Sequence, residues 1–348
     1  MNQTLNGIRR ILITILVAMG VGALFIVAIG ENPIDAYAAL FRGAFDGELR
    51  LGTTLAGFTP LLLTSIAFAI AAKAGAFNVG VEGEVFLGGI TAAYIGINWT
   101  FLPKPALYVA CFVGAMVVAA AWAFIPAVLR AYYNVNEVCT TILMNTVALY
   151  ITSYLVSGPM SAGTANAQSL PVTVRLYQFM KPSSVNVGIF IAAITVIVII
   201  FMLQKSSWGY KIRTVGLNPT HADYVGIDSK KVFIGAMMLS GMLGGMAGCI
   251  EVLGVHGYFL NNFATGLGSN GMLAALIVKN NMVSTPFMAF FLAVLKSGAM
   301  GMQQSTGVPK SLVDTITAVF IIIATMETAF QFTKKRKKQT EEKKEDKA

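Results

Sequence analysis

The stretch KAGAFNVGVEGEVFLGG, residues 73–89, contrasts with the apolar chain that carries it. It holds a lysine, an asparagine, two glutamates and five glycines, and strongly apolar segments flank it on both sides. Glycine weakens a helix by about 1 kcal/mol relative to alanine, and ionisable side chains are costly inside a membrane. The stretch therefore predicts either an ordinary cytoplasmic turn with its glutamates in water, or an irregular segment at membrane depth.

The composition places the chain in a membrane. Of 348 residues, 56% are hydrophobic and 12% are charged, and the mean hydropathy is +0.70, which excludes an ordinary soluble domain. Apolar segments that can cross about 30 Å of hydrocarbon recur along the chain. We predict an all-α polytopic membrane protein with about ten transmembrane helices. The predicted spans lie near residues 11–30, 51–72, 84–98, 105–129, 138–157, 187–204, 232–255, 267–280, 285–303 and 309–330.

The basic residues predict the orientation of these spans, because cytoplasmic loops carry an excess of Lys and Arg. With the first loop inside, 18 of the 25 basic residues fall on the cytoplasmic side, six fall outside and Lys296 lies within a span. Both termini are therefore expected in the cytoplasm. The net charge of +9 follows from this topology and is no indication of nucleic-acid binding.

Ten spans divide into five and five, which predicts an inverted repeat, since an odd number of spans reverses the direction of the second half. A weak internal echo supports the repeat. The span at 51–72 runs into the quoted stretch, and the span at 232–255 runs into GVHGYFLNNFATGLGSNG. Paired interruptions in corresponding positions point to a substrate path, because irregular backbone at membrane depth needs protein or a water-filled cavity around it.

Several polar residues near these interruptions are candidates for the path. Asn78 and Glu82 lie four residues apart and would share one helix face if the segment between them is helical. Asn145 in LMNT sits within a predicted span, and Glu251 lies toward the outer end of another. A polar group at such depth is a functional candidate by default, although an ion pair that only fixes packing is an alternative. The spacings within SGMLGGMAG predict close helix packing.

The cytoplasmic loop at 205–231 contains a short helix by its capping pattern. In NPTHADYVGID, Asn218 suits the N-cap, Pro219 the first helical position, and Gly226 a left-handed residue after the last turn. We interpret this helix, which includes Ala222, as a docking element for a cytoplasmic partner. A helix lying on the lipid surface is the alternative.

Enzymatic chemistry is not indicated. The three cysteines form no C-x-x-C pair, and the two histidines, His221 and His256, lie in different loops, so we expect no metal site. The segment GLGSNG spells a dinucleotide fingerprint but lacks the strand that the fingerprint requires. No phosphate-binding G-x-x-x-x-G-K-[ST] motif occurs. We expect no cofactor in this chain, and any energy for pumping must come from a partner or an ion gradient.

AGAFNVGVEGE resembles the signature FNIGVEGQ of permeases in bacterial ATP-binding-cassette (ABC) importers of the ribose and branched-chain amino acid class. The closest resemblance is to the nucleoside branch served by basic-membrane lipoproteins. Further similar segments run in order from about residue 50 to 330. They are NEVCTTILMNTVAL, RTVGLNPTHADYVGI, SGMLGGMAGCIEVLG, FATGLGSNGMLAALI and TGVPKSLVDTITAVFIII.

The resemblance implies a multi-pass permease of the bacterial plasma membrane that imports nucleosides. Its implied partners are an ABC ATPase that holds ATP and Mg²⁺, a second homologous permease, an extracellular substrate-binding lipoprotein, the solute and membrane lipid. It also implies that Asn218, Pro219, Ala222 and Gly226 couple to the ATPase. The implied translocation path comprises Asn78, Glu82, Asn145 and Glu251, to which we add Asn270. Ser269 and Asn270 stand where relatives carry an aromatic residue and an acid, which leaves a sugar or a vitamin open as the solute.

The expected domain organisation is a transmembrane permease domain at 1–333, with its coupling loop at 205–231, followed by a disordered charged tail at 334–348. Two other functions remain open. An ion-coupled secondary transporter would use Glu82, Glu251 and Lys296 as a proton relay, and a membrane assembly factor would carry no solute at all.

Overall fold

The computed structural model describes residues 19–28, 30–307, 311, 314, 315 and 318. Within these residues the chain is helical and forms no β-strand beyond three isolated bridges. The first helix described is Met19–Ala28. The others are α2 (Pro33–Phe45), α3 (Gly47–Lys73), α4 (Val81–Asn98), α5 (Lys104–Tyr133), α6 (Glu137–Ser157), α7 (Gly188–Lys205), α8 (Ser207–Leu217), α9 (Pro219–Tyr224), α10 (Ser229–Ile250), the π-helix η1 (Glu251–His256), α11 (Leu267–Ile277) and α12 (Thr285–Thr306).

The described residues fall into two compact units, a terminal unit drawn from the ranges 1–45 and 295–348 and a central unit of residues 46–294. In the described part of the terminal unit, α2 packs on the second half of α12 around a small core that includes Leu40 and Met302. The contact is close because glycines meet. A Cβ atom added at Gly43 would lie only 2.8 Å from the Gly298 carbonyl oxygen.

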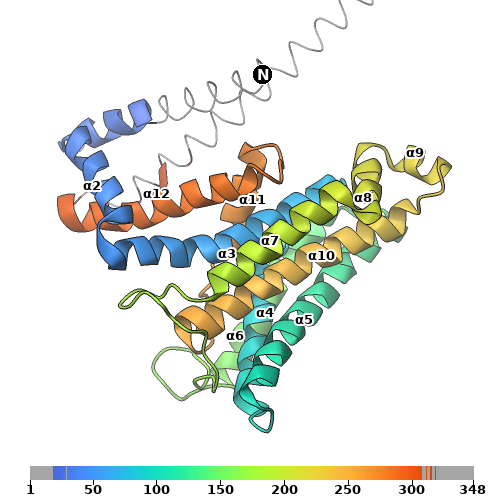
Figure 1. Cartoon of the computed structure of the whole chain (residues 1–348), viewed down its shortest axis with the longest axis horizontal. Helices are drawn as coiled ribbons and strands as arrows, with labels where there is room; N and C mark the ends of the chain where they lie inside the picture. Colours follow the sequence, from blue (N-terminus) through green and yellow to red (C-terminus); the bar gives the residue numbers. More distant parts are fainter. Residues whose placement is uncertain (1–18, 29, 308–310, 312–313, 316–317, 319–348) are drawn as a thin grey trace, which may run out of the picture. The chain divides into compact units, whose positions relative to one another are not determined.

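The central unit is organised around α10, which packs most extensively on α5, α4 and α3 (Figure 1). Its glycines form two contact faces. A Cβ atom at Gly241 would lie 2.6 Å from the Ala119 carbonyl oxygen of α5, and one at Gly244 would lie 2.8 Å from the Glu84 Cβ atom of α4. Helices approach this closely only where no side chain separates them. The close packing predicted from SGMLGGMAG is confirmed.

The predicted all-helical membrane architecture is confirmed, since the described residues include six helices that are long and apolar enough to cross a membrane. They are α3, α5, α6, α7, α10 together with η1, and α12, and a bent pair of Met19–Ala28 and α2 would make a seventh. Each predicted segment from 51–72 to 285–303 coincides with a helix, but α4 and the shorter α11 are not among the six. The count of ten, the inverted repeat and the cytoplasmic termini stay predictions. The tail at 334–348 and most of the segment at 309–330 lie outside the described residues.

The helix α4 begins part-way along the bundle. Its first turn lies against Gly244, which follows Ser229, the first residue of α10, by fifteen residues, or about 22 Å of helix. By contrast, α3 ends beside the loop at 205–231, where Gly216 of α8 touches the Lys73 main chain. The stretch at 73–89 therefore leads from this loop into the interior of the bundle.

Two helices were not predicted from the sequence patterns. The loop at 205–231 contains α8 in addition to the predicted short helix, and α2 precedes the first long helix of the central unit. Neither has an apolar run long enough to be recognised as a span.

Candidate functional site

The break between α3 and α4 is held together by Asn78. This side chain is fully buried, and its Oδ1 atom accepts a hydrogen bond of 2.9 Å from the Gly80 main-chain nitrogen. Its Nδ2 atom donates to Glu84 Oε1 and to Ser240 Oγ, both at 2.9 Å. One amide thus ties the irregular segment to the first turn of α4 and to the middle of α10. Because such groups are costly when left unpaired, these bonds define the course of the chain at the break.

Glu84 is the most deeply enclosed carboxyl group near the break. It is only 1% exposed, and its Oε2 atom has no hydrogen-bond partner among the described residues. The alternative that both glutamates of the stretch lie in water is therefore wrong for Glu84. Sequence reasoning singled out Glu82 and missed Glu84 and Ser240. Residues two apart on a helix differ by about 200° in direction, so one of the two glutamates had to face the neighbouring helices.

Asn145 of α6 holds the start of α4 from a second side. Its Oδ1 atom accepts from the Gly83 main-chain nitrogen at 2.8 Å, and its Nδ2 atom donates to the Val79 carbonyl oxygen at 2.8 Å. The first N–H groups of a helix lack intrahelical partners. Asn145 therefore caps α4 from a separate helix and remains partly exposed itself.

The second interruption meets the first at Glu82. Ser269, in the first turn of α11, donates through Oγ to Glu82 Oε2 at 3.3 Å. The main chains also touch, since a Cβ atom at Gly268 would lie 2.6 Å from the Glu82 nitrogen. On its other side α11 is anchored to α3, where Thr64 Oγ1 donates to the Leu267 carbonyl oxygen at 3.3 Å. The two interruptions that the sequence pairs thus lie side by side. Glu82 is partly exposed, in contrast to the buried Asn78.

Asn270 follows Ser269 in the same turn of α11. Its main-chain nitrogen donates to the Gly266 carbonyl oxygen at 3.0 Å, and its side chain is partly exposed. The structure therefore brings Glu82, Asn145 and Asn270 to the same region, around the first turns of α4 and α11. Asn78 is buried next to this region, among the packed residues that support it.

Glu251 lies farther along the bundle, at the point where α10 becomes the π-helix η1. It is 8% exposed, and its Oε2 atom lies 3.7 Å from His256 Nε2. The next residue, Val252, packs near Gly89, about two turns into α4. A π-helix has more residues per turn than an α-helix, and this wider turn brings residues five apart onto one face. Glu251 is therefore part of the packed wall and has its own partner.

The capped helix of the loop at 205–231 has the predicted geometry. Asn218 Oδ1 accepts from the His221 main-chain nitrogen at 3.0 Å, Pro219 begins α9, and Gly226 has a φ of +81°. Ala222 is buried, whereas Leu217 and Tyr224 are 88% and 86% exposed.

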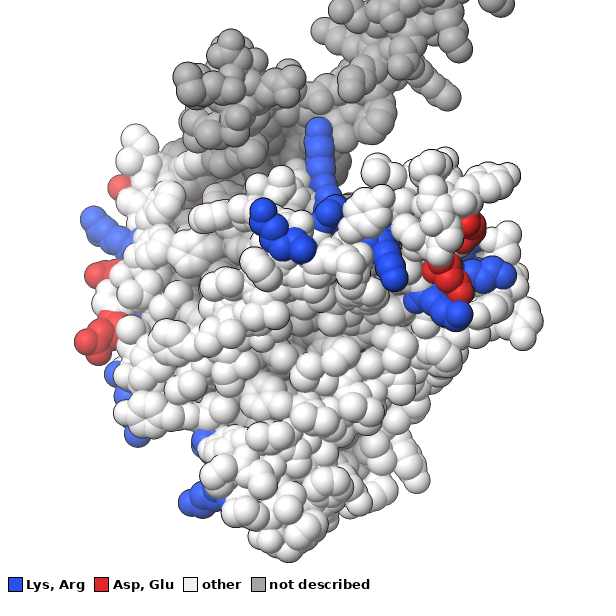
Figure 2. Space-filling model, turned by 45° about the vertical axis from the view of Figure 1, so that its right-hand side comes forward, with Lys and Arg blue, Asp and Glu red and all other residues white. Residues whose placement is uncertain are grey.

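A hydrogen bond from the Lys231 main chain lowers the pKa of Asp228, which caps α10. Lys and Arg gather at the end of the bundle that carries α8 and α9 (Figure 2).

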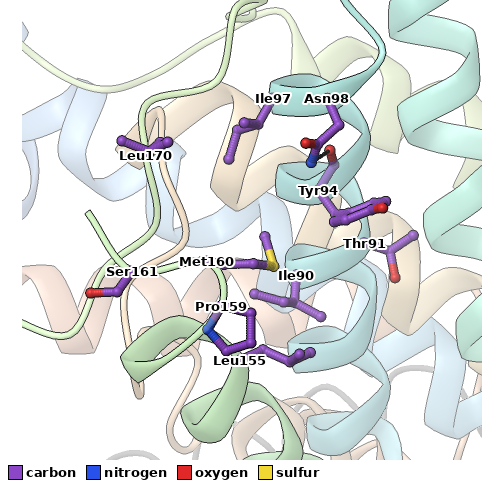
Figure 3. Close-up of a pocket in the computed structure, with 10 residues that line it drawn as sticks. All are labelled: Ile90, Thr91, Tyr94, Ile97, Asn98, Leu155, Pro159, Met160, Ser161 and Leu170. Atoms are coloured by element: carbon purple, nitrogen blue, oxygen red, sulfur yellow. Dashed lines mark hydrogen bonds between the residues drawn. The ribbon is translucent and has the colours of Figure 1, made fainter. Parts of the chain in front are cut away.

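A groove of about 450 Å³ lies at the opposite end of α4 from Glu82. Its walls come from α4, from the end of α6 and from the loop that follows α6 (Figure 3). Thr91, Tyr94 and Asn98 supply polar atoms, while Leu155 and Met160 are apolar. The sequence predicts that the loop after α6 is extracellular, and the orientation of the groove stays part of that prediction.

Comparison with known proteins decides the family. Residues 50–325 match the family described as the permease component of the branched-chain amino acid transport system. The chain belongs to this permease family. It is therefore a subunit of a transport system and, with its several apolar helices, a multi-pass protein of the plasma membrane.

Individual relatives cover nearly the whole permease. It is 33% identical to the guanosine ABC transporter permease protein NupP of Bacillus subtilis, over 92% of this chain and 94% of that protein. It is 30% identical to the nucleoside ABC transporter permease protein NupB of Lactococcus lactis, over 92% and 91%. The glucose ABC transporter permease protein TsgB13 of Haloferax volcanii is 32% identical, over 89% and 85%. The resemblance drawn from the sequence motifs is confirmed.

Proposed function

We propose that this permease is the membrane-spanning subunit of an ABC importer that moves nucleosides into the cell, with the energy supplied by a separate ATPase subunit. Two of its relatives are named for guanosine and for nucleosides. The permease itself carries no phosphate-binding motif for ATP, so ATP and Mg²⁺ are assigned to the partner.

The observation that carries the proposal is a partly exposed carboxylate deep in the bundle. Glu82 lies beside Ser269 at the meeting point of two interrupted helices, about 20 Å from the cytoplasmic start of α10 by the rise of a helix. A charged side chain facing lipid at such depth costs at least about 3 kcal/mol. Glu82 therefore faces a water-filled path or another protein chain, which is how interrupted helices line transport sites.

Each candidate residue has a role in this proposal. Glu82, Asn145 and Asn270 line the path around the first turns of α4 and α11. Asn78 lies beside the path and, with Glu84, holds the break in shape. Glu251 belongs to the wall nearer the outer end, where its pairing with His256 makes it a weaker candidate for contact with the solute. A proton relay through Glu82, Glu251 and Lys296 is less favoured, because Glu251 pairs with His256 in the wall and the hydrogen-bond partner of Glu82 is the hydroxyl of Ser269, which does not titrate.

The coupling loop supplies the proposed contact with the ATPase. The bounds of α9 are set by Asn218, Pro219 and Gly226. The buried Ala222 packs the helix against its neighbours. This leaves Leu217 and Tyr224 exposed at its ends. Apolar side chains that are exposed next to a basic surface favour contact with a protein partner over exposure to solvent. The proposed assembly also contains a second homologous permease and an extracellular substrate-binding lipoprotein.

A simple sugar is the second candidate solute, because one relative of similar identity and slightly lower coverage is named for glucose. Uptake of radiolabelled guanosine and glucose, in a host without its own carriers for them and with the whole importer expressed, separates the two. We expect guanosine uptake that vanadate abolishes and a protonophore spares. ATP-dependent uptake of glucose without guanosine would overturn the nucleoside assignment. Uptake that the protonophore abolishes directly, at undiminished ATP, would overturn the ABC mechanism.

A further inference from the structure

Glu82 and Ser269 form an unusual pair, because they come from the first turns of two different short helices. The Oγ–Oε2 distance of 3.3 Å exceeds the usual range for a hydroxyl bonded to a carboxylate, which is about 2.5–3.0 Å. A carboxylate offers about four acceptor sites, and Ser269 is the one hydrogen-bond partner that the described residues give it. The pair is therefore open to further hydrogen bonds.

The spacing of the pair is held by main-chain contacts rather than by the side chains alone. Gly268 brings the α11 backbone against the Glu82 backbone. Asn145 holds the next residue of α4, Gly83, by its main-chain nitrogen at 2.8 Å, and Thr64 holds the start of α11. A polar pair fixed in this way loses little freedom when a ligand binds, which favours selective recognition.

We infer that Glu82 and Ser269 bind neighbouring hydroxyl groups on the sugar ring of the solute. The carboxylate accepts O–H donors from two adjacent hydroxyls, and the serine hydroxyl accepts or donates to one of them, taking the place of the weak bond between the pair. A solute that lacks these hydroxyls would leave a carboxylate poorly solvated in the path, so the site rejects it. The inference rests on the proposed function and makes that function more specific, because it names the chemical group that is recognised.

Neighbouring ring hydroxyls occur in ribonucleosides and in free sugars alike. The experiment therefore includes guanosine, 2′-deoxyguanosine, 2′,3′-dideoxyguanosine and glucose as labelled solutes. Uptake is measured with the whole importer carrying the wild-type permease, Glu82→Gln, Ser269→Ala or the control Glu48→Gln. Glu48 is an exposed carboxylate in the first turn of α3, so its change tests the loss of a charge away from the pair.

The extracellular binding protein also selects solutes, and its own affinity for each nucleoside is measured separately. Since it is the same in every strain, its contribution cancels when each variant is compared with the wild type. We expect wild-type uptake of guanosine to exceed that of the dideoxy compound by about tenfold or more after this correction, because a hydrogen bond to a charged group contributes about one order of magnitude. Glu82→Gln and Ser269→Ala should each reduce this ratio severalfold, and Glu48→Gln should leave it unchanged.

An unchanged ratio in both variants, with all solutes slowed equally, would overturn the inference and leave Glu82 a structural residue. If Glu82→Gln prevents assembly, Ser269→Ala alone decides, because Ser269 is exposed and we expect the loss of its hydroxyl to leave the fold intact. The proposed function fails in a different way, by absence of nucleoside uptake in the wild type. Uptake of glucose alone, with a preference lost in the same two variants, would assign the site to a free sugar.

Discussion

Asn78 and Glu84 are joined across the helix break by a hydrogen bond of 2.9 Å from Nδ2 to Oε1. The bond closes the irregular segment onto the first turn of the helix that follows it, and Ser240 of α10 receives the second N–H of the same amide. The partly exposed Glu82 lies two residues before Glu84. A buried polar contact therefore determines where the exposed carboxylate points.

This arrangement predicts that Asn78→Ala destabilises the protein. The change leaves the Gly80 nitrogen and Glu84 Oε1 without their partner, and each buried group left unpaired costs about 1–3 kcal/mol. Thermal unfolding of the purified complex in detergent measures the effect. We expect Glu84→Leu to be similarly harmful, whereas Glu82→Gln should leave the melting temperature nearly unchanged, since Glu82 is partly exposed. Equal melting temperatures for Asn78→Ala and the wild type would contradict the role of the bond.

A second prediction concerns the packing of α10 on α4. A Cβ atom at Gly248 would overlap the Val85 carbonyl oxygen, so Gly248→Ala should force the helices apart and destabilise the fold by about 1–3 kcal/mol. The matched control is Gly57→Ala in α3, where an added Cβ atom meets nothing within 4 Å. The yield of folded protein and its melting temperature compare the two. A control as harmful as the Gly248 change would refute the explanation by close packing.

The coupling loop supplies a third prediction. Gly226 has a φ of +81°, a conformation that costs a β-branched residue about 1–2 kcal/mol or more. Gly226→Val should detach or uncouple the ATPase while the permease remains in the membrane. Gly226→Asn is the control, because asparagine tolerates positive φ better than other residues. Co-purification of the ATPase and transport-linked ATP hydrolysis are the readouts, and normal values for both in Gly226→Val would argue against docking at α9.

The predicted orientation is tested by labelling single cysteines in intact cells. The native Cys139 is exposed, so it is first replaced by serine. Cysteines at Lys104 and Lys181 should react with an impermeant reagent from outside, and one at Lys230 should not. All three positions are exposed in the described structure. The reverse pattern of labelling would invert the topology and place the coupling loop on the wrong side for an ATPase.

The sequence alone determined the class of the protein and most of its helices. Long apolar runs have one solution in a membrane, because every backbone polar group must be paired within its own helix. Local signals were sufficient for α9 as well, since Asn218, Pro219 and Gly226 act through bonds and dihedral angles within a few residues. The close approach of α10 to its neighbours also followed from glycine spacing, because a residue without a side chain lets another helix come close whichever helix that is.

The candidate site depended on tertiary structure. Nothing local distinguishes Glu82 from Glu84. Their environments differ because Gly244 of α10 packs against Glu84, while Gly268 of α11 packs against Glu82. The contact of Ser269 with Glu82 spans 187 residues, and capping of α4 by Asn145 joins residues 62 apart. Such contacts arise from the packing of distant helices, and periodicity and capping patterns carry no information about which helices become neighbours.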